Sequence, residues 1–341
     1  MRSRFFILFL AALIVFPIGA SAADAMWVRG NLHTHTKNSD GTGTPQAVAD
    51  WYKANGYQFL VITDHEKVTD VAPLDADPND GFILIPGEEL GVSGEGVPIH
   101  ANALGIAQTL KSPPRSKTSG ETVRNLVDYI RKAGGIPMVN HPNWYSALDH
   151  RDLLAIKGPY LLEIANMGEG SENEGSPSRL STEQVWDVLL SNGRTVYATA
   201  TDDMHVLEEG PTGPNGPGKG WVVTRVPELT PSAVLEALAK GEFYASTGVE
   251  LSEVSFDGRG MGVRVERQDG RKYLIRFVGK WGEILQETVG TKAVYRFAGT
   301  PEPGAYVRCK VIADDHTVAW TQAYRPRASS SGPMPRGLFG R

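Results

Sequence analysis

The sequence predicts an α/β fold built on a parallel sheet, followed by a small all-β module. Two observations lead to this expectation. Up to Gly248, short apolar runs alternate with helical stretches, an order that favours parallel strands joined by right-handed crossovers. Beyond Gly248 the runs are short and alternating, with turn residues between them and little helical periodicity. The first part is therefore expected to curl into an open sheet or a barrel, and the second to form a sandwich-like module.

The length and composition are those of a globular protein. The 341 residues, of which 41 % are hydrophobic, suffice for one large domain and a small one. Cys309 is the lone cysteine, so an intramolecular disulfide is excluded. Any bound metal must then be held by nitrogen and oxygen ligands rather than by thiolates.

The segment Met1 to Ala22 has the pattern of a secretory signal. Arg2 and Arg4 form a basic start, Phe5 to Phe16 an apolar core, and Ala20-Ser21-Ala22 a small-residue cleavage site. An uncleaved membrane anchor is the alternative, but the apolar core is shorter than the roughly 20 residues that span a bilayer. We therefore expect an exported protein, periplasmic or secreted, without a stable transmembrane anchor.

The charge of the mature chain bears on its partners. Two of the 34 Lys and Arg residues lie in the signal segment, and the 39 Asp and Glu residues all follow it, which leaves a formal net charge of −7. A nucleic-acid partner would require a basic stripe, so none is expected. A small-molecule substrate is the expected partner, and the sequence does not define an oligomeric state.

The elements of the first part follow from apolar runs, caps and glycines. Thr44-Pro45 begins a helix as N-cap and first helical residue, and Gly56 ends it. The expected strands after it are Phe59–Ile62, Phe82–Ile85, Ile99–Ile106, Ile136–Val139, Tyr160–Asn166, Thr195–Thr199 and Trp221–Thr224, and the expected helices are Glu121–Ala133, Thr182–Leu190 and Pro231–Lys240.

Two irregular segments and the module complete the chain. The Gly/Pro-rich segment Gly210–Gly220 is a candidate lid or substrate-selecting loop, and Gly241–Gly248 is expected to be a turn-rich hinge. Tyr273–Val278 and Ala305–Ile312 are expected strands of the module. The predicted division is a signal segment at 1–22, a barrel at 24–248, a β-rich module at 249–324 and a disordered tail at 325–341, rich in Ser, Pro, Gly and Arg.

Potential metal ligands recur where strands end. His33 and His35 lie on one side of an extended chain, and a polar turn can bring Asp40 back to the same point. A single such pair is more often solvated or satisfied by neighbours. Six of the eight histidines lie near predicted strand ends, however, where barrels gather functional groups, and only His150 and His316 do not. The candidate ligands are His33, His35, Asp40, His65, Glu89, His100, His141, Asp203 and His205.

In this arrangement the chain resembles the PHP (polymerase and histidinol phosphatase) superfamily. The motifs, in order, are His33-Thr-His35, Thr63-Asp-His65, Pro86-Gly-Glu-Glu89, His141-Pro142 and Asp203-Met-His205. The resemblance covers roughly Trp27 to Gly248. The Ser39-Asp40-Gly41 turn and the segment Glu242 to Gly248 look more like the CehA/McbA-type metallohydrolase branch, which includes carbamate-ester hydrolases.

The resemblance implies a distorted seven-stranded (β/α) barrel with a di- or trinuclear site of Mn²⁺, Zn²⁺ or Fe²⁺. Many relatives have histidine where this chain has Asp40, so an altered metal preference or occupancy is expected there. Carried over to this sequence, one ion would be held by His33, His35, Glu89 and Asp203, a second by Asp40, His65 and His205, and a third by Glu89, His100 and His141.

The expected chemistry is hydrolysis by a metal-bound hydroxide, because a water that bridges two cations has its pKa lowered toward neutrality. Asp64 and Glu163 are interpreted as groups that orient imidazoles, with proton transfer as the alternative role. Basic loop residues could close over an anionic substrate or simply be solvated; these are Arg115, Lys117, Arg179 and Lys219.

Three functions remain open at this stage. The leading hypothesis is a metal-dependent phosphoesterase acting on a small substrate. The second is a carboxylic or carbamic ester hydrolase with the same site. The third is a non-catalytic metal- or ligand-binding envelope protein whose β module binds a partner such as a glycan.

Overall fold

The structure is a computed structural model that describes residues 25–74, 78–93, 96–266, 268, 270–298 and 301–326. The predicted signal segment Met1–Ala22 and residues 327–341 of the predicted tail lie outside the described residues. Among the described helices, none is both long and apolar enough to cross a membrane.

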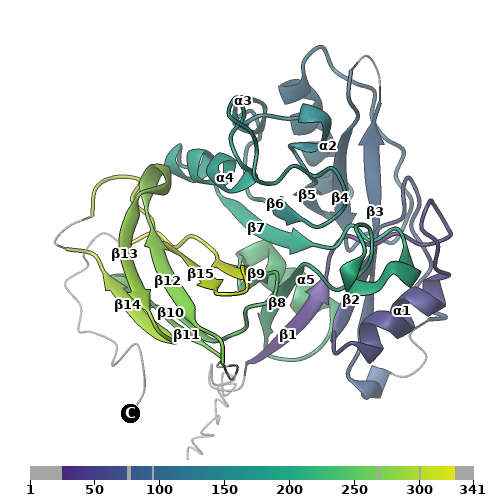
Figure 1. The fold of residues 1–341 in the computed structure, drawn as a ribbon. Helices are drawn as coiled ribbons and strands as arrows, with labels where there is room; N and C mark the ends of the chain where they lie inside the picture. The colour runs from purple at the N-terminus through teal and green to yellow at the C-terminus, as the bar shows by residue number, and fades with distance from the viewer. Residues whose placement is uncertain are drawn as a thin grey trace, which may run out of the picture.

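Strands and helices alternate through the first part of the chain (Figure 1). The strands are β1 (Met26–Asn31), β2 (Phe59–Ile62), β3 (Ile83–Val92), β4 (Ile99–Leu104), β5 (Ile136–Val139), β6 (Tyr160–Asn166), β7 (Val196–Thr201), β8 (Trp221–Val226) and β9 (Phe243–Ser246). The helices are α1 (Pro45–Ala54), α2 (Ser119–Lys132), α3 (His150–Leu153), α4 (Thr182–Ser191) and α5 (Pro231–Lys240), with 3₁₀ turns η1 (Pro78–Asp80), η2 (Trp144–Ser146) and η3 (Leu207–Thr212).

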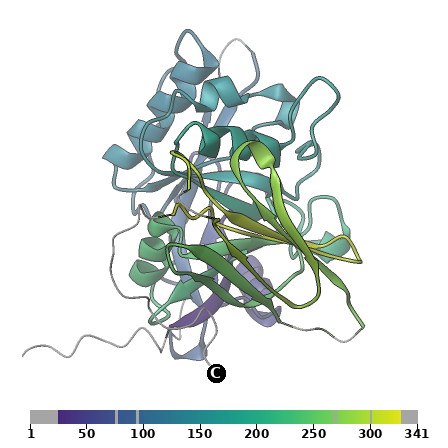
Figure 2. The same cartoon turned by 90° about the vertical axis from the view of Figure 1, so that its left-hand side faces the viewer.

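Beyond Gly248 the regular elements in the described residues are strands and one 3₁₀ turn. They are β10 (Leu251–Phe256), β11 (Gly260–Val265), β12 (Tyr273–Val278), η4 (Lys280–Gly282), β13 (Ile284–Val289), β14 (Lys292–Arg296), β15 (Arg308–Ala313) and β16 (Val318–Thr321). Figure 2, in which this module faces the viewer, shows its strands beside the first part of the chain.

Side-chain caps fix the starts of the helices. The Thr44 side chain accepts a hydrogen bond from the backbone N–H of Ala47, with Pro45 as the first helical residue of α1. Ser181 and Gln184 form a reciprocal capping box at the start of α4. These bonds satisfy N–H groups that have no partner inside the helix. The helices then pack on the sheet: α1 on β2, α2 on β4 and β5, α4 on β6 and β7, and α5 on β3 and β8.

In the described part of the chain, thirteen strands form one hydrogen-bonded sheet in the order β13-β12-β15-β16-β9-β8-β1-β2-β3-β4-β5-β6-β7. The pairs β1–β2, β2–β3, β5–β6 and β6–β7 are parallel. However, β4 is antiparallel to both of its neighbours, and β8 is antiparallel to β1. The prediction of a parallel sheet is therefore wrong for these two strands.

The sheet curls so that β7 lies against β8 and β9. No strand pairing joins them among the described residues, so a barrel closed by hydrogen-bonded strands is not confirmed. The Gln322 side chain takes the place of a partner strand. Its Oε1 accepts from Ala198 N at 2.8 Å, and its Nε2 donates to Ala198 O at 2.9 Å. This amide satisfies one residue of an otherwise open strand edge.

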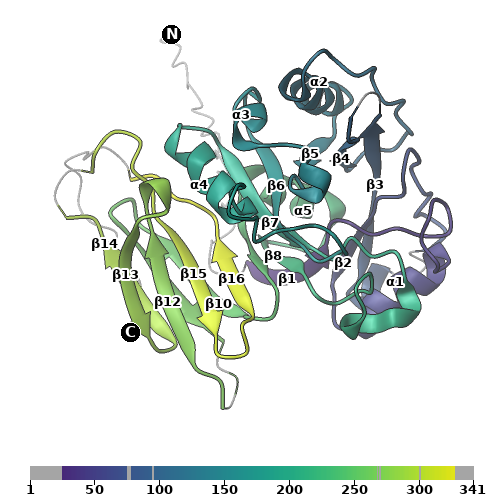
Figure 3. The same ribbon diagram turned by 45° about the horizontal axis from the view of Figure 1, so that its top comes forward.

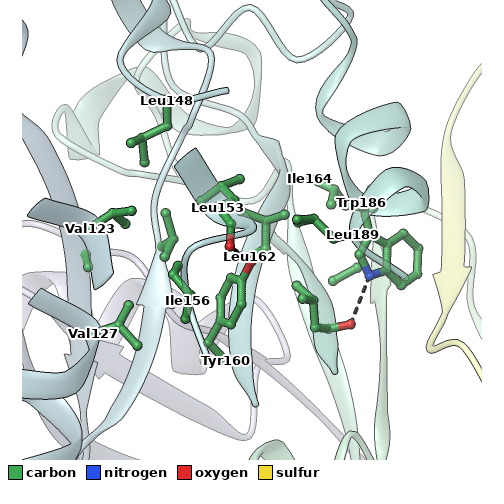
Figure 4. Packing of buried hydrophobic residues seen from close by; sticks show 14 of the residues in the cluster. Val123, Val127, Leu148, Leu153, Ile156, Tyr160, Leu162, Ile164, Trp186 and Leu189 are labelled. Carbon is green, nitrogen blue, oxygen red and sulfur yellow. Dashed lines mark hydrogen bonds between the residues drawn. The ribbon is translucent and has the colours of Figure 1, made fainter. Parts of the chain in front are cut away.

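A buried apolar cluster holds α2, α3 and α4 on the sheet (Figure 4). Val123 and Val127 of α2 contribute to this cluster together with Leu162 of β6 and Trp186 of α4. Trp186 is fully buried, and its Nε1 donates to the carbonyl oxygen of Val196 at 2.9 Å, so its one polar group is satisfied. This packing lies between the helices and the strands of the sheet.

The module is built on the same sheet as the first part. The strand β16 pairs with β9, with Thr321 opposite Tyr244, and β9 pairs with β8. Figure 3 shows β16 on the side of the module that faces β8. The predicted hinge Gly241–Gly248 is therefore wrong, because its central half, Phe243–Ser246, is the strand β9. A second sheet, β10-β11-β14, packs over β12 and β15 through Met261, Val263 and Phe277. Two packed sheets agree with the predicted sandwich-like architecture, but one of them continues into the first part.

A buried ion pair also joins the two parts. Arg308 of β15 is 2 % exposed, and its Nε and Nη2 donate to the two carboxylate oxygens of Asp187 on α4 at 2.7 and 2.6 Å. The hydroxyl of Tyr306 donates to the same carboxylate at 2.9 Å, and Glu183 lies 2.8 Å from Arg308. Removing one partner of such a pair leaves an uncompensated buried charge.

We expect Arg308→Met to lower the free energy of unfolding by about 3 to 5 kcal/mol, because Asp187 would stay buried without its cation. Urea denaturation measures this change. The matched control is Arg276→Met, which removes the more exposed ion pair with Glu287 on the same module. This substitution should lower the free energy of unfolding by less than about 1 kcal/mol. Equal effects of the two substitutions would show that the buried pair does not join the parts.

Candidate metal centre

The nine predicted ligands lie at one edge of the sheet. His33 and His35 follow the end of β1, and a parallel bridge between Thr34 and Met204 joins them to the segment after β7. His100 lies at the start of β4, which is the same edge because β4 runs antiparallel to its neighbours. The other predicted ligands reach this edge from the loop after β1 and from the segments around β2, β3, β5 and β7; they are Asp40, His65, Glu89, His141, Asp203 and His205.

Four of these side chains converge on one point. The Nε2 atom of His33 lies 3.1 Å from Glu89 Oε2 and 3.1 Å from Asp203 Oδ1. The Nε2 atom of His35 lies 3.3 and 3.1 Å from the same two oxygens. These two imidazoles and two carboxylates are the set that the resemblance assigned to one ion.

A second group forms around Asp40. Its Oδ1 lies 3.6 Å from His35 Nδ1, and its Oδ2 lies 3.6 Å from both His65 Nε2 and His205 Nε2. The Asp40 side chain is 54 % exposed, whereas His35 is fully buried. This group contains the predicted second set and adds His35.

A third group shares Glu89 with the first. The Glu89 carboxylate lies 3.2 Å from His100 Nδ1, 3.4 Å from His141 Nε2 and 3.3 Å from His65 Nδ1. His65, Glu89 and His100 form the compact group, and His141 lies beside it within reach of Glu89. This differs from the set Glu89, His100 and His141 expected from the resemblance.

The donor atoms fit divalent ions. Two atoms that each lie about 2.1 Å from one ion are roughly 3.0 to 3.4 Å apart in octahedral or tetrahedral geometry. Separations of 3.1 to 3.4 Å in the groups that share Glu89 match this spacing. The Nδ1 atom of His35 is buried without a hydrogen-bond partner in the described residues. Glu89 and Asp203 form described ion pairs with histidines alone, so their charges call for further cations.

The same carboxylates raise the proton affinity of the imidazoles. Burial lowers the pKa of His35, but Asp203 and Glu89 outweigh burial and raise it to about 9. Burial is likewise outweighed at His33, mainly by Asp203, and at His141, mainly by Glu89, so both pKa values lie above the ordinary one. Divalent ions would replace these protons, since a ligand imidazole must be neutral.

Glu163 holds two of the histidine segments in place. Its carboxylate accepts from His33 Nδ1 at 2.7 Å, from the backbone N–H of His141 at 2.7 Å, from Asn166 Nδ2 at 2.8 Å and from Thr201 Oγ1 at 2.6 Å. Burial raises its pKa, but His33 outweighs burial and keeps the pKa below the usual value. The carboxylate thus holds the ring of His33, and its alternative role in proton transfer stays a prediction.

We expect Glu163→Gln to weaken metal binding by about 10- to 100-fold, because the amide cannot accept all four donors and would turn the His33 ring. Competition with a chelating dye measures the affinity, and circular dichroism checks the fold. The control is Asp64→Asn, which alters an equally buried carboxylate that contacts no imidazole. If both variants bound the tightest ion equally well, Glu163 would not position His33.

The contacts of Asp64 do not agree with the first of the two roles predicted for it. Its carboxylate accepts from Thr36 N and Oγ1, from Ser39 Oγ and from Thr69 Oγ1, at 2.5 to 2.8 Å. None of these partners is an imidazole, so the interpretation of Asp64 as a group that orients one is wrong. It instead fixes the turn that leads to Asp40.

Three residues that were not singled out from the sequence contact the ligands or Glu163. Asn140 donates to Glu89 Oε1 at 2.7 Å, and Asn166 donates to Asp203 Oδ2 at 3.1 Å as well as to Glu163. Thr201 donates to Glu163. Asn166 and Thr201 are the last residues of β6 and β7, and Asn140 follows β5, so their place at strand ends was a usable signal.

The basic loop residues are held by protein groups. Arg179 donates to Asn143 Oδ1 at 2.8 Å and to two backbone carbonyls, and Arg115 donates to Val97 O. Lys219 Nζ donates to the carbonyl oxygens of Met167 and Pro214. Neither these three nor Lys117 lines the cavity described below, which counts against the prediction that they close over an anionic substrate. The three with described partners are also not simply solvated.

The candidate lid is anchored at its end beside the site. Asp202 is buried and accepts from the backbone N–H groups of Gly218, Lys219 and Gly220 at 2.7 to 2.8 Å. Within the loop, Asn215 lines the cavity. The segment Gly210–Gly220 thus forms part of the wall, and its role as a lid stays a prediction.

A cavity of about 700 Å³ opens over the ligand groups. Its lining includes seven of the nine predicted ligands, all but His33 and His35, and the aromatic and acidic side chains of Trp144, Tyr145, Glu169 and Glu172. Four lining residues other than glycine have positive φ values, namely His141, Tyr145, Glu172 and Asp203. Such backbone is costly and persists where the surrounding structure imposes it, as it does at functional sites.

Comparison with protein-family models and with curated proteins gives no match. Solved structures with a related arrangement are found at low similarity. One is a two-domain protein from Bacteroides vulgatus described as containing a predicted PHP-like metal-dependent phosphoesterase; it is 17 % identical, with 89 % of this chain and 96 % of that chain covered and a TM-score of 0.47.

Two further structures match a smaller part of the chain. A candidate metal-dependent phosphoesterase from Bifidobacterium adolescentis is 18 % identical over 56 % of this chain and 91 % of that one, with a TM-score of 0.40. An amidohydrolase from Chromobacterium violaceum, with bound sulfate and no metal, is 19 % identical over 53 % and 88 %, with a TM-score of 0.38. At this level of similarity, function has to be inferred from the residues of this chain.

Proposed function

We propose that this chain is a metal-dependent hydrolase of the PHP superfamily that acts as a phosphoesterase on a small substrate. One observation carries the proposal: three adjoining groups of imidazoles and carboxylates, two of which share Glu89 and one of which forms around Asp40, lie beneath an open cavity. The ordered motifs that resemble the superfamily supply the residues of these groups. A non-catalytic envelope protein would have no need for so complete a set of donors beneath a cavity.

Bound divalent ions would lower the pKa of a coordinated water toward neutrality and stabilise negative charge that develops on a phosphoryl or carbonyl oxygen. The chain holds the donors for this chemistry in place. Glu163 fixes the ring of His33, and Asn140 fixes the carboxylate of Glu89. Asn166 links Glu163 to Asp203, so the donors on β3, β6 and β7 form one connected network.

Hydrolysis of a carboxylic or carbamic ester is the second candidate, and one observation favours it. No Lys or Arg side chain from the described residues lines the cavity, whereas a dianionic phosphate monoester would profit from such a cation. The looser resemblance to the CehA/McbA-type branch points in the same direction. A phosphodiester, with its single negative charge, is compatible with the same lining.

The other features of the proposal concern location and division of labour. The signal-like segment Met1–Ala22 supports export to the periplasm or the medium. The ligands all precede Gly248, so the chemistry is assigned to the first part of the chain and the β module to its support, orientation or anchoring. The ions would be two or three of Mn²⁺, Zn²⁺ or Fe²⁺.

The test is an assay of purified protein, reconstituted with Mn²⁺, Zn²⁺ or Fe²⁺ in turn, on aryl phosphate, aryl phosphodiester, and aryl acetate and carbamate. Turnover of the phosphate esters that chelator removes and metal restores would support the leading proposal. Turnover of the carbon esters alone would favour the second candidate. Inactivity on every substrate with every metal would favour a binding protein.

A further inference from the structure

One wall of the cavity is aromatic and acidic. Trp144 lies beside the third ligand group, with its ring 5.4 Å from that of His100 and 5.2 Å from that of His141, measured between centroids. The ring of Tyr145 lies edge-on to that of Trp144, with 4.8 Å between the ring centroids, and Tyr145 is 71 % exposed. An aromatic surface therefore extends from the ligands toward solvent.

The acidic part of this wall comes from the loop after β6. A β-carbon built on Gly168 would lie 3.2 Å from Asp203 Oδ2, and one built on Gly170 would lie 3.7 Å from Trp144 Cδ1. The loop therefore passes from the first ligand group to the aromatic surface. It carries Glu169 and Glu172, and both line the cavity.

Hydrogen bonds hold this loop in its position. Ser171 Oγ is bonded to Asn166 Oδ1 and to Gly168 O at 2.7 Å each, and the Glu169 N–H donates to Asn215 Oδ1 at 3.1 Å. The Glu172 carbonyl accepts from Asn143 Nδ2 at 3.0 Å. Hydrogen bonds to Asn166, Asn215 and Asn143 thus hold the backbone that carries the two carboxylates.

The two carboxylates have no counter-charge in the described structure. No hydrogen bond or ion pair to the Glu169 or Glu172 side chain is found among the described residues, and no Lys or Arg of that set lines the cavity. The ligand groups would carry divalent ions, so the cavity has a cationic floor and an anionic, aromatic wall. A substrate that matches both is negatively polarised at its scissile bond and positively charged a short distance away.

We propose that the natural substrate carries an ammonium or quaternary ammonium group, joined by a short linker to the ester that is hydrolysed. The ester lies at the ligand groups, and the cation lies against Trp144 and Tyr145 near Glu169 and Glu172. Aromatic faces attract such cations, and carboxylates add to the attraction. This inference rests on the proposed hydrolase function and specifies its substrate class.

The test uses pairs of molecules that differ in one atom. Nitrophenyl phosphocholine is compared with an isostere in which carbon replaces the quaternary nitrogen, so that its head group is neutral while the phosphate is unchanged; we call this the neutral isostere. Acetylcholine is compared with its own carbon isostere. Binding of phosphocholine and of its neutral isostere is also measured by calorimetry on the Mn²⁺-loaded protein. We expect the charged member of each productive pair to be preferred by about 10-fold in kcat/KM or affinity.

Matched variants locate the preference. Glu169→Gln and Glu172→Gln together should reduce the ratio to about threefold or less, because the aromatic contribution alone remains. Glu174→Gln, an exposed acid on the same loop that does not line this cavity, should leave the ratio unchanged. These substitutions keep the ligand groups intact.

The outcomes separate the two proposals. Equal use and equal binding of charged and neutral members would overturn the cationic-substrate inference, whether or not the protein is a hydrolase. A preference that Glu174→Gln removes as fully as the double variant would also overturn it. Tighter binding of phosphocholine without turnover of any ester would support the cation site and count against the hydrolase.

Discussion

Asp203→Ala is expected to abolish turnover and to remove bound metal while leaving the protein folded. The Asp203 Oδ1 atom lies 3.1 Å from Nε2 of both His33 and His35, so its loss breaks the first ligand group. Mutating a residue that only orients a ligand typically lowers metal affinity or activity by about 10- to 100-fold. Removing a ligand itself should lower them by more than about 100-fold. His35→Ala should act in the same way, because His35 belongs to the first two groups.

Three measurements check this expectation: metal content after dialysis, turnover with excess metal, and the thermal unfolding curve. The controls are His150→Ala, at the start of α3, and His316→Ala, on an exposed turn; neither lies in a ligand group of the described residues. Near wild-type turnover by Asp203→Ala would refute the assignment of the first group. Loss of the cooperative unfolding transition would show that Asp203 is needed for folding.

The strands and helices whose bounds were predicted correctly are those marked by residues close to them in the sequence. The strands Phe59–Ile62, Ile136–Val139 and Tyr160–Asn166 have the predicted bounds, since each is a short apolar run with polar or turn residues after it. The helix Pro231–Lys240 also has its predicted bounds, because Pro231 and Gly241 mark its ends. Such signals depend on neighbours in sequence and need no knowledge of the fold.

Strand direction and pairing could not be predicted in this way. Pro86-Gly87 indicates the end of a strand, but β3 continues through it to Val92. Its partner changes there: Pro86 is opposite Ile62 of β2, and Gly87 is opposite Leu104 of β4. A β-carbon at Gly87 would lie 2.9 Å from Val61, so the glycine serves close packing rather than a turn.

The candidate site also could be predicted only in part from the sequence. The rule that functional groups gather at the carboxyl ends of strands agrees with the position of most predicted ligands. His100 is the exception, because it lies at the start of β4 and reaches the same edge only since that strand is antiparallel to its neighbours. The interpretation of Asp64 as a group that orients an imidazole was wrong, and its neighbour His65 gave no support for it, because adjacent side chains of an extended chain point to opposite sides. The supporting amides of Asn140 and Asn166 are common at strand ends, and only their contacts with Glu89 and Asp203 distinguish them.

A chain that ends at Gly248 is expected to be insoluble, although all the candidate ligands precede that residue. The cut removes β16 and leaves the edge of β9 without its partner. It also removes Gln322 from Ala198 on the edge of β7, and Arg308 from the buried Asp187. An open strand edge and an unpaired buried charge each favour aggregation or unfolding.

The matched control is a chain that ends at Pro326, which retains every contact described here and should remain soluble and able to bind metal. An intermediate variant, Gln322→Ala in the full chain, should lower the free energy of unfolding by about 1 to 3 kcal/mol, because it leaves the N–H and carbonyl of Ala198 without the Gln322 side chain. Expression yield, gel filtration and metal content compare the three. If the chain ending at Gly248 were soluble and bound its full metal complement, the shared sheet would be dispensable, and its turnover per folded molecule would then show whether the module contacts substrate.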